Sequence, residues 1–201
     1  MKKQTLQTSS MTIPKKVLKD LVVETKRGLS SYYLQPEGKL VQFINIRDVV
    51  DGRVNQETVT QANVKETDAF AKTRIEPNDV IVTVKGSAFK AGVASQKEKD
   101  AIISANLIAF KLKPEIQPEL VVAYLNSPKG QQELHARSAG IAQKFLSERA
   151  LLEISIPVPP MEKQKQLAVY LQLSKEYDTL MERERDLRKQ INNSVVQNMM
   201  G

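Results

Sequence analysis

The sequence lacks cysteine and contains a single histidine, His135. Without cysteine the chain has no disulfide bond, zinc–thiolate site or thiol nucleophile, and this composition suits a protein of the cytoplasm. One histidine excludes histidine-rich metal sites and leaves no evident pair of base and nucleophile. The residues around His135 are typical of an exposed helix surface. The sequence thus predicts no catalytic residue, no metal ion and no cofactor.

The chain also lacks long apolar runs. None approaches the roughly 18 residues that a membrane-spanning helix requires, and the lysines at positions 2 and 3 are not followed by the apolar segment of a signal peptide. Residues 85–92 hold two glycines and a serine between two strand-like segments, but the Gly-Lys-Ser/Thr of a P-loop is missing. We therefore expect a soluble cytoplasmic protein that has no membrane contact and that binds rather than catalyses.

Basic residues are present in excess and are concentrated at the start of the chain. The net charge is +7, and residues 1–27 carry seven lysines and arginines against two acids, which is +5 of that total. Such charge is compatible with binding a polyanion, because basic side chains release the counterions condensed on phosphates. The alternative is a solvated, lysine-rich face that keeps the protein soluble.

Local patterns predict an α+β body over residues 1–160. Residues 80–84 are β-branched throughout, which is the strongest strand signal in the chain. Residues 14–24 have apolar side chains at 3–4 spacing, which favours a short helix or turn, and residues 26–33 read as a basic loop with a hinge glycine. The other expected elements are strands at 41–46 and 102–112, a weaker strand within 54–67, helices at 118–125 and from 128 toward Gly140, and a short turn capped by Ser147.

Residues 161–201 predict one long helix. No glycine or proline occurs from 161 to 200, so a continuous helix there is about 58 Å long. Apolar side chains recur at 3–4 spacing along it, interrupted by Glu184, and a single seam on so long a helix calls for a partner helix. A helix folded back on its own body is the alternative, but we favour a second copy of the chain. The expected dimer contacts are Tyr170, Leu173, Tyr177, Leu180, Leu187 and Ile191.

Several ordered segments carry a resemblance to a known family. They are Ile13-Pro14, Arg27-Gly28, residues 43–48, residues 76–83 leading to Gly86-Ser87, residues 143–147, and residues 154–160 with their three prolines. In this order they resemble the specificity subunit of Type I restriction-modification systems, in a half-length form with one target recognition domain and one spacer helix. One departure is Lys163: after the prolines the family usually reads x-Glu-Gln, and here the residues are Glu162-Lys163-Gln164, so a lysine stands at the acidic position.

The resemblance implies a mixed-sheet target recognition domain followed by a long coiled-coil helix. It also implies binding to double-stranded DNA beside two other subunits, a DNA methyltransferase (modification) subunit and a motor-nuclease (restriction) subunit. A homodimer formed through the helix should read a bipartite inverted repeat, because two identical readers are then related by a two-fold axis.

Chemistry and the loops that match the family give the expected DNA contacts. Lysines are expected to hold phosphates, whereas Arg27 suits guanine and Gln143 suits adenine at base edges. Two rival hypotheses remain: a homologue that dimerises and binds the modification subunit without reading DNA, and a small enzyme acting on nucleic acid. The predicted DNA-binding residues are Lys26, Arg27, Ser30, Tyr32, Lys85, Ser87, Lys90, Gln143 and Lys144.

Overall fold

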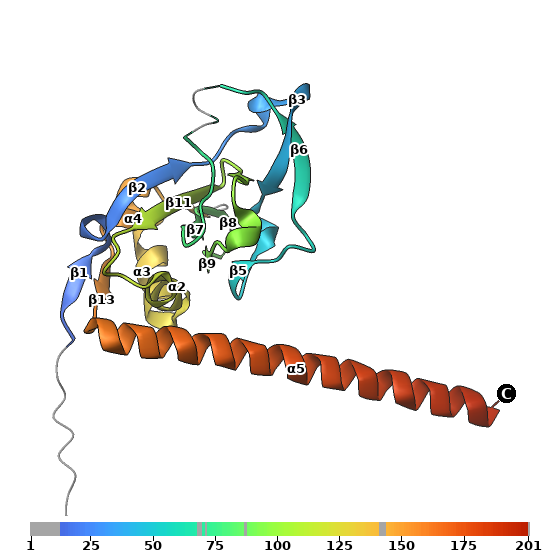
Figure 1. Cartoon of the computed structure of the whole chain (residues 1–201). Coiled ribbons are helices and arrows are strands. Elements are labelled where there is room, and N and C mark those ends of the chain that lie inside the picture. Colours follow the sequence, from blue (N-terminus) through green and yellow to red (C-terminus); the bar gives the residue numbers. More distant parts are fainter. Residues whose placement is uncertain (1–12, 68–69, 71, 87, 141–143, 201) are drawn as a thin grey trace, which may run out of the picture.

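The computed structural model describes residues 13–67, 70, 72–86, 88–140 and 144–200. A six-stranded sheet forms the centre of the body (Figure 1). Its strands, in the order in which they lie side by side, are β2 (Val22–Arg27), β11 (Leu107–Leu112), β7 (Val80–Thr83), β9 (Ala91–Val93), β5 (Gly52–Val54) and β4 (Val49–Val50). All four residues of β7 are buried, which explains the unbroken β-branched run of the sequence.

Smaller sheets and short helices complete the body. A three-stranded sheet consists of β10 (Ile102–Ile103), β3 (Leu34–Ile44) and β6 (Thr60–Val64). Two-stranded pairs are formed by β1 (Lys15–Val17) with β13 (Ser155–Pro157), and by β8 (Lys85–Gly86) with β12 (Lys144–Phe145). The helices of the body include α2 (Pro118–Asn126), α3 (Pro128–Arg137) and α4 (Glu148–Leu152), with 3-10 turns at Leu18–Asp20, Ser31–Tyr33, Ile46–Asp48 and Gln96–Glu98.

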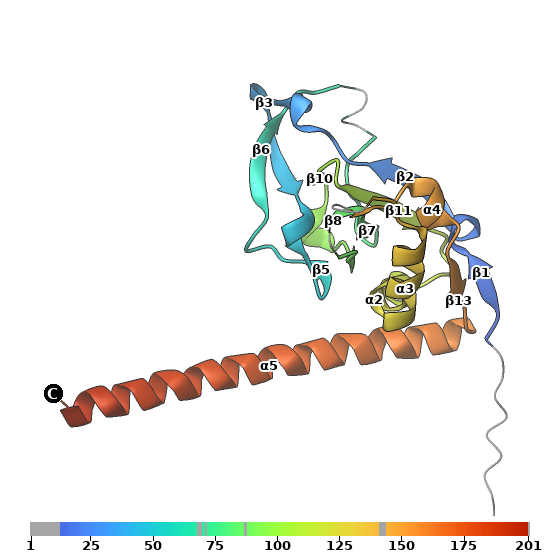
Figure 2. The same ribbon diagram turned by 180° about the vertical axis from the view of Figure 1, so that it is seen from behind.

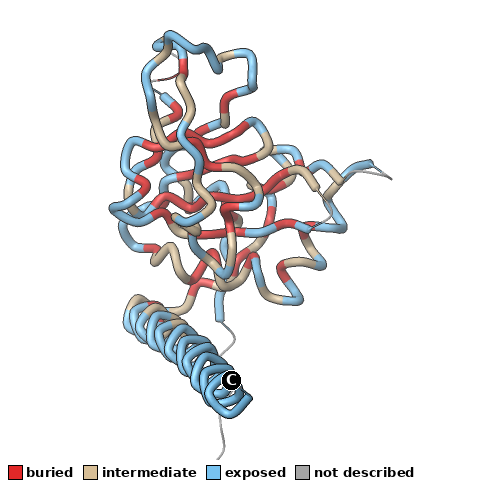
Figure 3. Tube along the Cα trace, turned by 90° about the vertical axis from the view of Figure 1, so that its right-hand side faces the viewer, coloured by how far each residue is buried: buried red, intermediate tan, exposed pale blue. Residues whose placement is uncertain are grey.

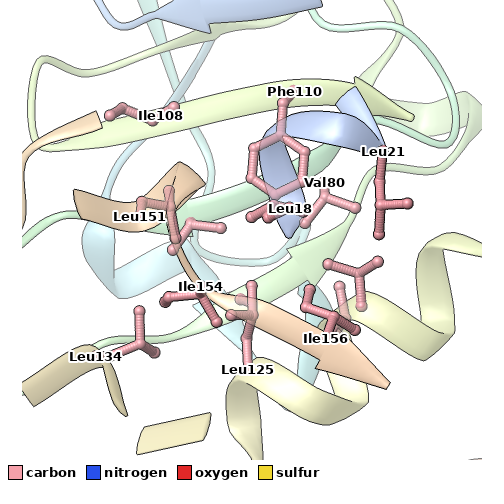
Figure 4. Close-up of a cluster of buried hydrophobic side chains, with 14 of the residues drawn as sticks. Leu18, Leu21, Val80, Ile108, Phe110, Leu125, Leu134, Leu151, Ile154 and Ile156 are labelled. Atoms are coloured by element: carbon pink, nitrogen blue, oxygen red, sulfur yellow. The ribbon is translucent and has the colours of Figure 1, made fainter. Parts of the chain in front are cut away.

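The main hydrophobic core joins the two ends of the body. Figure 4 shows Leu18 and Leu21 from the start of the chain close to Val80 and Phe110 of the central sheet. Ile154 and Ile156, more than 130 residues later, lie in the same cluster beside α2 and α3. Full burial of one such side chain stabilises the fold by about 1.5–3 kcal/mol. The pairing of β1 with β13 next to the start of the long helix (Figure 2) therefore closes the body on itself.

Most predicted elements are confirmed, and the region around residues 14–33 is the main correction. A helix or turn was expected over 14–24, but the structure has β1, one 3-10 turn and the first residues of β2. Residues 26 and 27, expected in a loop, are the last two of β2 and pair with β11. The expected strand within 54–67 is β6, while Val54 ends β5. β-Branched Val22 and Val23 favour the strand, and pairing with β11 outweighs the local 3–4 spacing.

The long helix α5 (Met161–Met200) touches the body only along its first half (Figure 1). Buried Gln164 accepts a hydrogen bond from the Gln117 backbone N–H at 3.0 Å and donates to the Pro159 carbonyl at 2.9 Å. Farther along, Lys175 Nζ donates to the Asp51 carbonyl at 2.9 Å, and burial lowers the pKa of this lysine. A cleft of about 830 Å³ separates these two attachments.

Beyond the second attachment α5 leaves the body. Every residue from 176 to 200 is exposed, and Figure 3 shows the far end of the helix uniformly in the colour of exposed residues. Within the described ranges, no helix combines the length and apolar character needed to cross a membrane. The architecture is therefore a mixed α+β body with a projecting helix, as the sequence predicts.

Candidate nucleic-acid interface

The segment of residues 144–148 crosses one end of the central sheet. In β12, Phe145 pairs with Lys85 of β8, and the Leu146 N–H donates to the Val84 carbonyl at 2.9 Å. Two residues later, Glu148 accepts a hydrogen bond from Arg27 Nε at 2.6 Å. This crossing segment thus brings cations from separate strands to one edge of the body, and we call Arg27, Lys85 and Lys144 the basic rim.

The Arg27 guanidinium is exposed to solvent, and its partner Glu148 is half-buried at the start of a helix. Its side chain is 79% exposed, whereas that of Glu148 is 23% exposed. Glu148 is the first residue of α4, and the preceding Ser147 caps this helix by accepting a hydrogen bond from the Ala150 N–H. A carboxylate at a helix N-terminus is stabilised by the helix dipole. An ion pair with one exposed partner contributes little to stability, about 0–1 kcal/mol.

The other part of the basic rim combines cations with an aromatic ring. Lys85 Nζ lies 6.0 Å from the centroid of the Phe145 ring. That ring is 45% exposed, while Lys85 and Lys144 are half-buried. Exposed aromatics among basic side chains are typical of surfaces that bind nucleic acids. Sequence reasoning missed Phe145, although its position directly after Lys144 was the available signal.

Two further predicted contacts follow Arg27 along the chain. The Leu29 N–H donates to the Ile103 carbonyl at 2.8 Å, and the 3-10 turn Ser31–Tyr33 comes next. Ser30 is exposed, and Tyr32 is the most exposed aromatic of the body at 81% among the described residues. Tyr32 meets Tyr33 edge to face with centroids 5.5 Å apart. The structure therefore places both predicted residues on the surface beside the end of β2.

Gly28 has a different role from the hinge that the sequence suggested. A Cβ atom at this position would lie 1.9 Å from the backbone oxygen of Ser104. The close approach of two backbones, and not conformational freedom, requires glycine here. Glycine at position 28 therefore lets the end of β2 lie against the turn that precedes β11.

Gly28→Ala is expected to destabilise the protein by about 1–3 kcal/mol, the usual cost of forcing extra atoms into a packed site. Urea denaturation followed by circular dichroism measures this change in the free energy of unfolding. Ser30→Ala, two residues away and exposed, is the control and should change it by less than about 0.5 kcal/mol. Equal stability of the two variants would contradict the steric role assigned to Gly28.

One predicted DNA contact, Lys26, is wrong because the residue is buried. Lys26 is only 4% exposed, and its ammonium lies 2.8 Å from Asp79 in the interior, so it has no free surface for a phosphate. Alternation along β2 turns Lys26 inward where Arg27 turns outward. Lys90 is exposed and lines the cleft between the body and α5, and its contact with DNA stays a prediction. Ser87 and Gln143, also predicted, lie outside the described residues.

The remaining expectations concern metals and His135. His135 is exposed on α3 as predicted, with its ring 5.1 Å from that of Phe89. In the part of the chain that the structure describes, no cluster of three or more histidine, cysteine or acidic side chains could hold a metal ion.

A body with a basic, partly aromatic rim, joined to a projecting helix, is compatible with a protein that binds nucleic acid. Residues 15–193 match the family described as the Type I restriction modification DNA specificity domain. The chain belongs to this family, as its motifs suggested. Membership in a family of specificity domains agrees with the prediction that the chain recognises DNA and is not itself catalytic.

Two relatives that are named specificity subunits of Type I restriction enzymes are similar to most of the chain. The EcoBI specificity subunit of Escherichia coli is 24% identical over 181 residues, which cover 87% of this chain and 36% of the relative. The MjaVIII specificity subunit of Methanocaldococcus jannaschii is 26% identical over 175 residues, covering 85% and 40%. The chain therefore spans about two fifths of the length of these relatives.

Solved structures share the fold. The HsdS subunit from Thermoanaerobacter tengcongensis superimposes with a TM-score of 0.61 at 18% identity, over 87% of this chain and 40% of that one. The S subunit from M. genitalium gives a TM-score of 0.54 at 23% identity, over 92% and 46%. These similarities confirm the predicted combination of a mixed α+β recognition domain and a long C-terminal helix.

Proposed function

We propose that the chain reads double-stranded DNA through the basic rim and homodimerises through α5. Two bodies then read the halves of a bipartite inverted repeat and bring a modification subunit and a restriction subunit to it in the cytoplasm. In this proposal residues 1–160 are the recognition domain and residues 161–201 are the dimerisation and spacer helix. The observation that carries it is that α5 has two opposite faces, of which the body covers only one.

The two faces follow from helical geometry. At about 100° per residue, the residues of α5 that are buried or half-buried gather on one side of the helix. Gln164, Ala168, Leu171 and Lys175 are such residues and lie against the body or line its cleft. The predicted seam is centred about 180° away from them. Its six side chains are 50–67% exposed: Tyr170, Leu173, Tyr177, Leu180, Leu187 and Ile191.

An uncovered apolar face of this length supports a helical partner. Contiguous apolar surface on a soluble protein marks an interaction site, and 3–4 spacing suits the packing of a second helix. A second copy offers the same face, so a two-fold pair is self-complementary. Because each body sits on the side of α5 away from the seam, pairing of the helices leaves both basic rims accessible.

The resemblance and the relatives support the other parts of the proposal. The matched relatives are named specificity subunits of Type I restriction enzymes. One structure with a TM-score of 0.62 comes from a study of complex assembly and conformational transition in a type I R-M system. By analogy, the chain would contribute sequence recognition to such a complex, while methyl transfer and cleavage belong to other subunits.

DNA binding is tested by removing the rim lysines. Lys85→Ala with Lys144→Ala should weaken binding to all sequences and reduce the slope of log affinity against log salt by about 1–2, because each lysine neutralises about one phosphate. Fluorescence anisotropy at several salt concentrations measures this slope. Lys113→Ala removes an equally charged side chain at the other end of β11 and should leave the slope unchanged.

The same titration distinguishes the proposed function from the rival hypothesis of a homologue that dimerises without reading DNA. A dimer that binds a modification subunit but has no measurable affinity for any DNA would support the regulatory homologue. Equal salt slopes for the wild type and the double variant, with DNA binding intact, would move the interface away from the basic rim.

A further inference from the structure

We infer that Glu148 is a positioning residue that aims Arg27 at a base edge, so that this pair determines the choice of one base pair in the recognition site. The inference rests on the proposed DNA-reading function and adds to it a residue that sequence reasoning did not single out. Its basis is the contact between Arg27 Nε and Glu148 Oε2 at 2.6 Å, which joins two elements 121 positions apart in the chain.

The contact uses only one of the donor nitrogens of Arg27. A guanidinium has five N–H donors in a planar fork, and recognition of guanine O6 and N7 requires two of them. Glu148 engages Nε, and among the described residues neither Nη1 nor Nη2 has a hydrogen-bond partner. Within the described residues, the N–H donors of both terminal nitrogens are therefore available to a base. A carboxylate bound at Nε fixes the plane of the guanidinium and leaves Nη1 and Nη2 to donate to a base.

Both ends of the pair are anchored. Arg27 is the last residue of β2, where its backbone pairs with Ile108 of β11. Glu148 begins α4, and the neighbouring Leu146 and Leu151 are fully buried. The pair therefore links the sheet to the crossing segment, with little freedom for the carboxylate to move. Fixing an otherwise flexible arginine before binding reduces the entropy lost when it contacts a base.

The charge of Glu148 also acts against indiscriminate binding. A carboxylate beside Arg27 offsets its attraction to phosphates, which carry no sequence information directly. A cation that only contacts DNA phosphates binds more weakly beside a carboxylate. A hydrogen-bond donor that must be aimed at a base is held in place by one. The half-buried rim lysines, Lys85 and Lys144, are instead expected to contact phosphates.

The test selects preferred sites from a random DNA library with the full chain and then measures affinities for single base-pair changes. Arg27→Ala is expected to lose discrimination at one base pair in each half-site, by about tenfold to a hundredfold. Glu148→Gln, which keeps the side-chain shape, should lose about tenfold at that same base pair while binding non-specific DNA at least as well as the wild type. The double variant should lose no more than Arg27→Ala alone, because the two residues act as one unit.

Glu153→Gln is the matched control. Glu153 directly follows α4 and pairs with exposed Arg149 at 3.1 Å. Its replacement by glutamine removes the same charge as Glu148→Gln, a short distance away in the sequence. It should leave every base preference unchanged. Urea denaturation of each variant verifies that it folds, and Arg27→Lys, which keeps the charge but not the fork, provides a second variant expected to lose the same preference.

The outcomes separate the inference from the proposed function. If Glu148→Gln raises affinity for all sequences and retains every preference, the glutamate only masks charge and the inference is wrong. If Arg27 variants retain all preferences, another side chain reads the site and the inference is equally wrong. A wild-type protein that selects no sequence overturns the DNA-reading function itself, and the inference with it.

Discussion

Replacing Leu173 and Leu180 by lysine is expected to convert the proposed dimer of the full chain into a monomer. These side chains lie on the exposed face of α5 and are 58% and 65% exposed in the single chain. A two-fold dimer buries four such side chains, and burial of the part of each that is still exposed contributes about 1–2 kcal/mol, so about 4–8 kcal/mol of association free energy is lost. Four lysines in the seam add charge repulsion. Light scattering should report twice the 22.6 kDa chain mass for the wild type and once that mass for the variant.

The control places the same charges elsewhere on the helix. Thr179 and Asn193 are exposed and lie away from the seam at about 100° per residue, so their double replacement by lysine should leave the dimer intact. A wild-type monomer, or a seam variant that remains a dimer, would contradict the homodimer proposal. The monomeric variant should also bind a single half-site about as strongly as the whole inverted repeat.

Breaking the buried ion pair between Lys26 and Asp79 has the second large effect. The two residues are 4% and 0% exposed, and their charged atoms lie 2.8 Å apart. Asp79 also accepts a hydrogen bond from the Glu76 N–H at 2.8 Å. Removing one partner leaves the other charge buried and uncompensated, which costs about 3–5 kcal/mol. Lys26→Met should therefore reduce the free energy of unfolding by that amount in urea denaturation.

Lys111→Met is the matched control on the adjacent strand. Lys111 pairs with Glu76 at 2.6 Å, and this hydrogen bond lowers the pKa of Glu76, yet both side chains are about half exposed. Water solvates either charge once its partner is removed, so the cost should stay below about 1 kcal/mol. Similar losses for the two methionine variants would show that burial of the Lys26–Asp79 pair does not set its contribution.

The same comparison explains why adjacent basic residues have different roles. Lys26 and Arg27 are neighbours in sequence, and both were expected to contact DNA. Because successive side chains of a strand point to opposite faces, one forms a buried pair and the other forms part of the basic rim. Sequence alone did not show that the residues lie in a strand, since their loop-like surroundings outweighed Val22 and Val23.

Local patterns were sufficient for most of the architecture. The β-branched residues of β7, proline at the first positions of α2 and α3, and the absence of glycine and proline from α5 each act within a few residues. The same holds for the seam of α5, because helical periodicity places its members on one side whatever the rest of the chain does.

Local patterns in the sequence therefore predict the mixed α+β body, the long helix, its apolar seam and the family. The burial of Lys26, the position of Lys90 in the cleft under α5, and the placement of Phe145 beside Lys85 and of Glu148 beside Arg27 depend on how the chain packs. The physical reason is the separation along the chain over which each interaction acts. Propensity and periodicity arise between residues a few positions apart, whereas burial and ion pairing depend on contacts such as that of Arg27 with Glu148, 121 positions along the chain, which exist only once the sheet and the crossing segment have assembled.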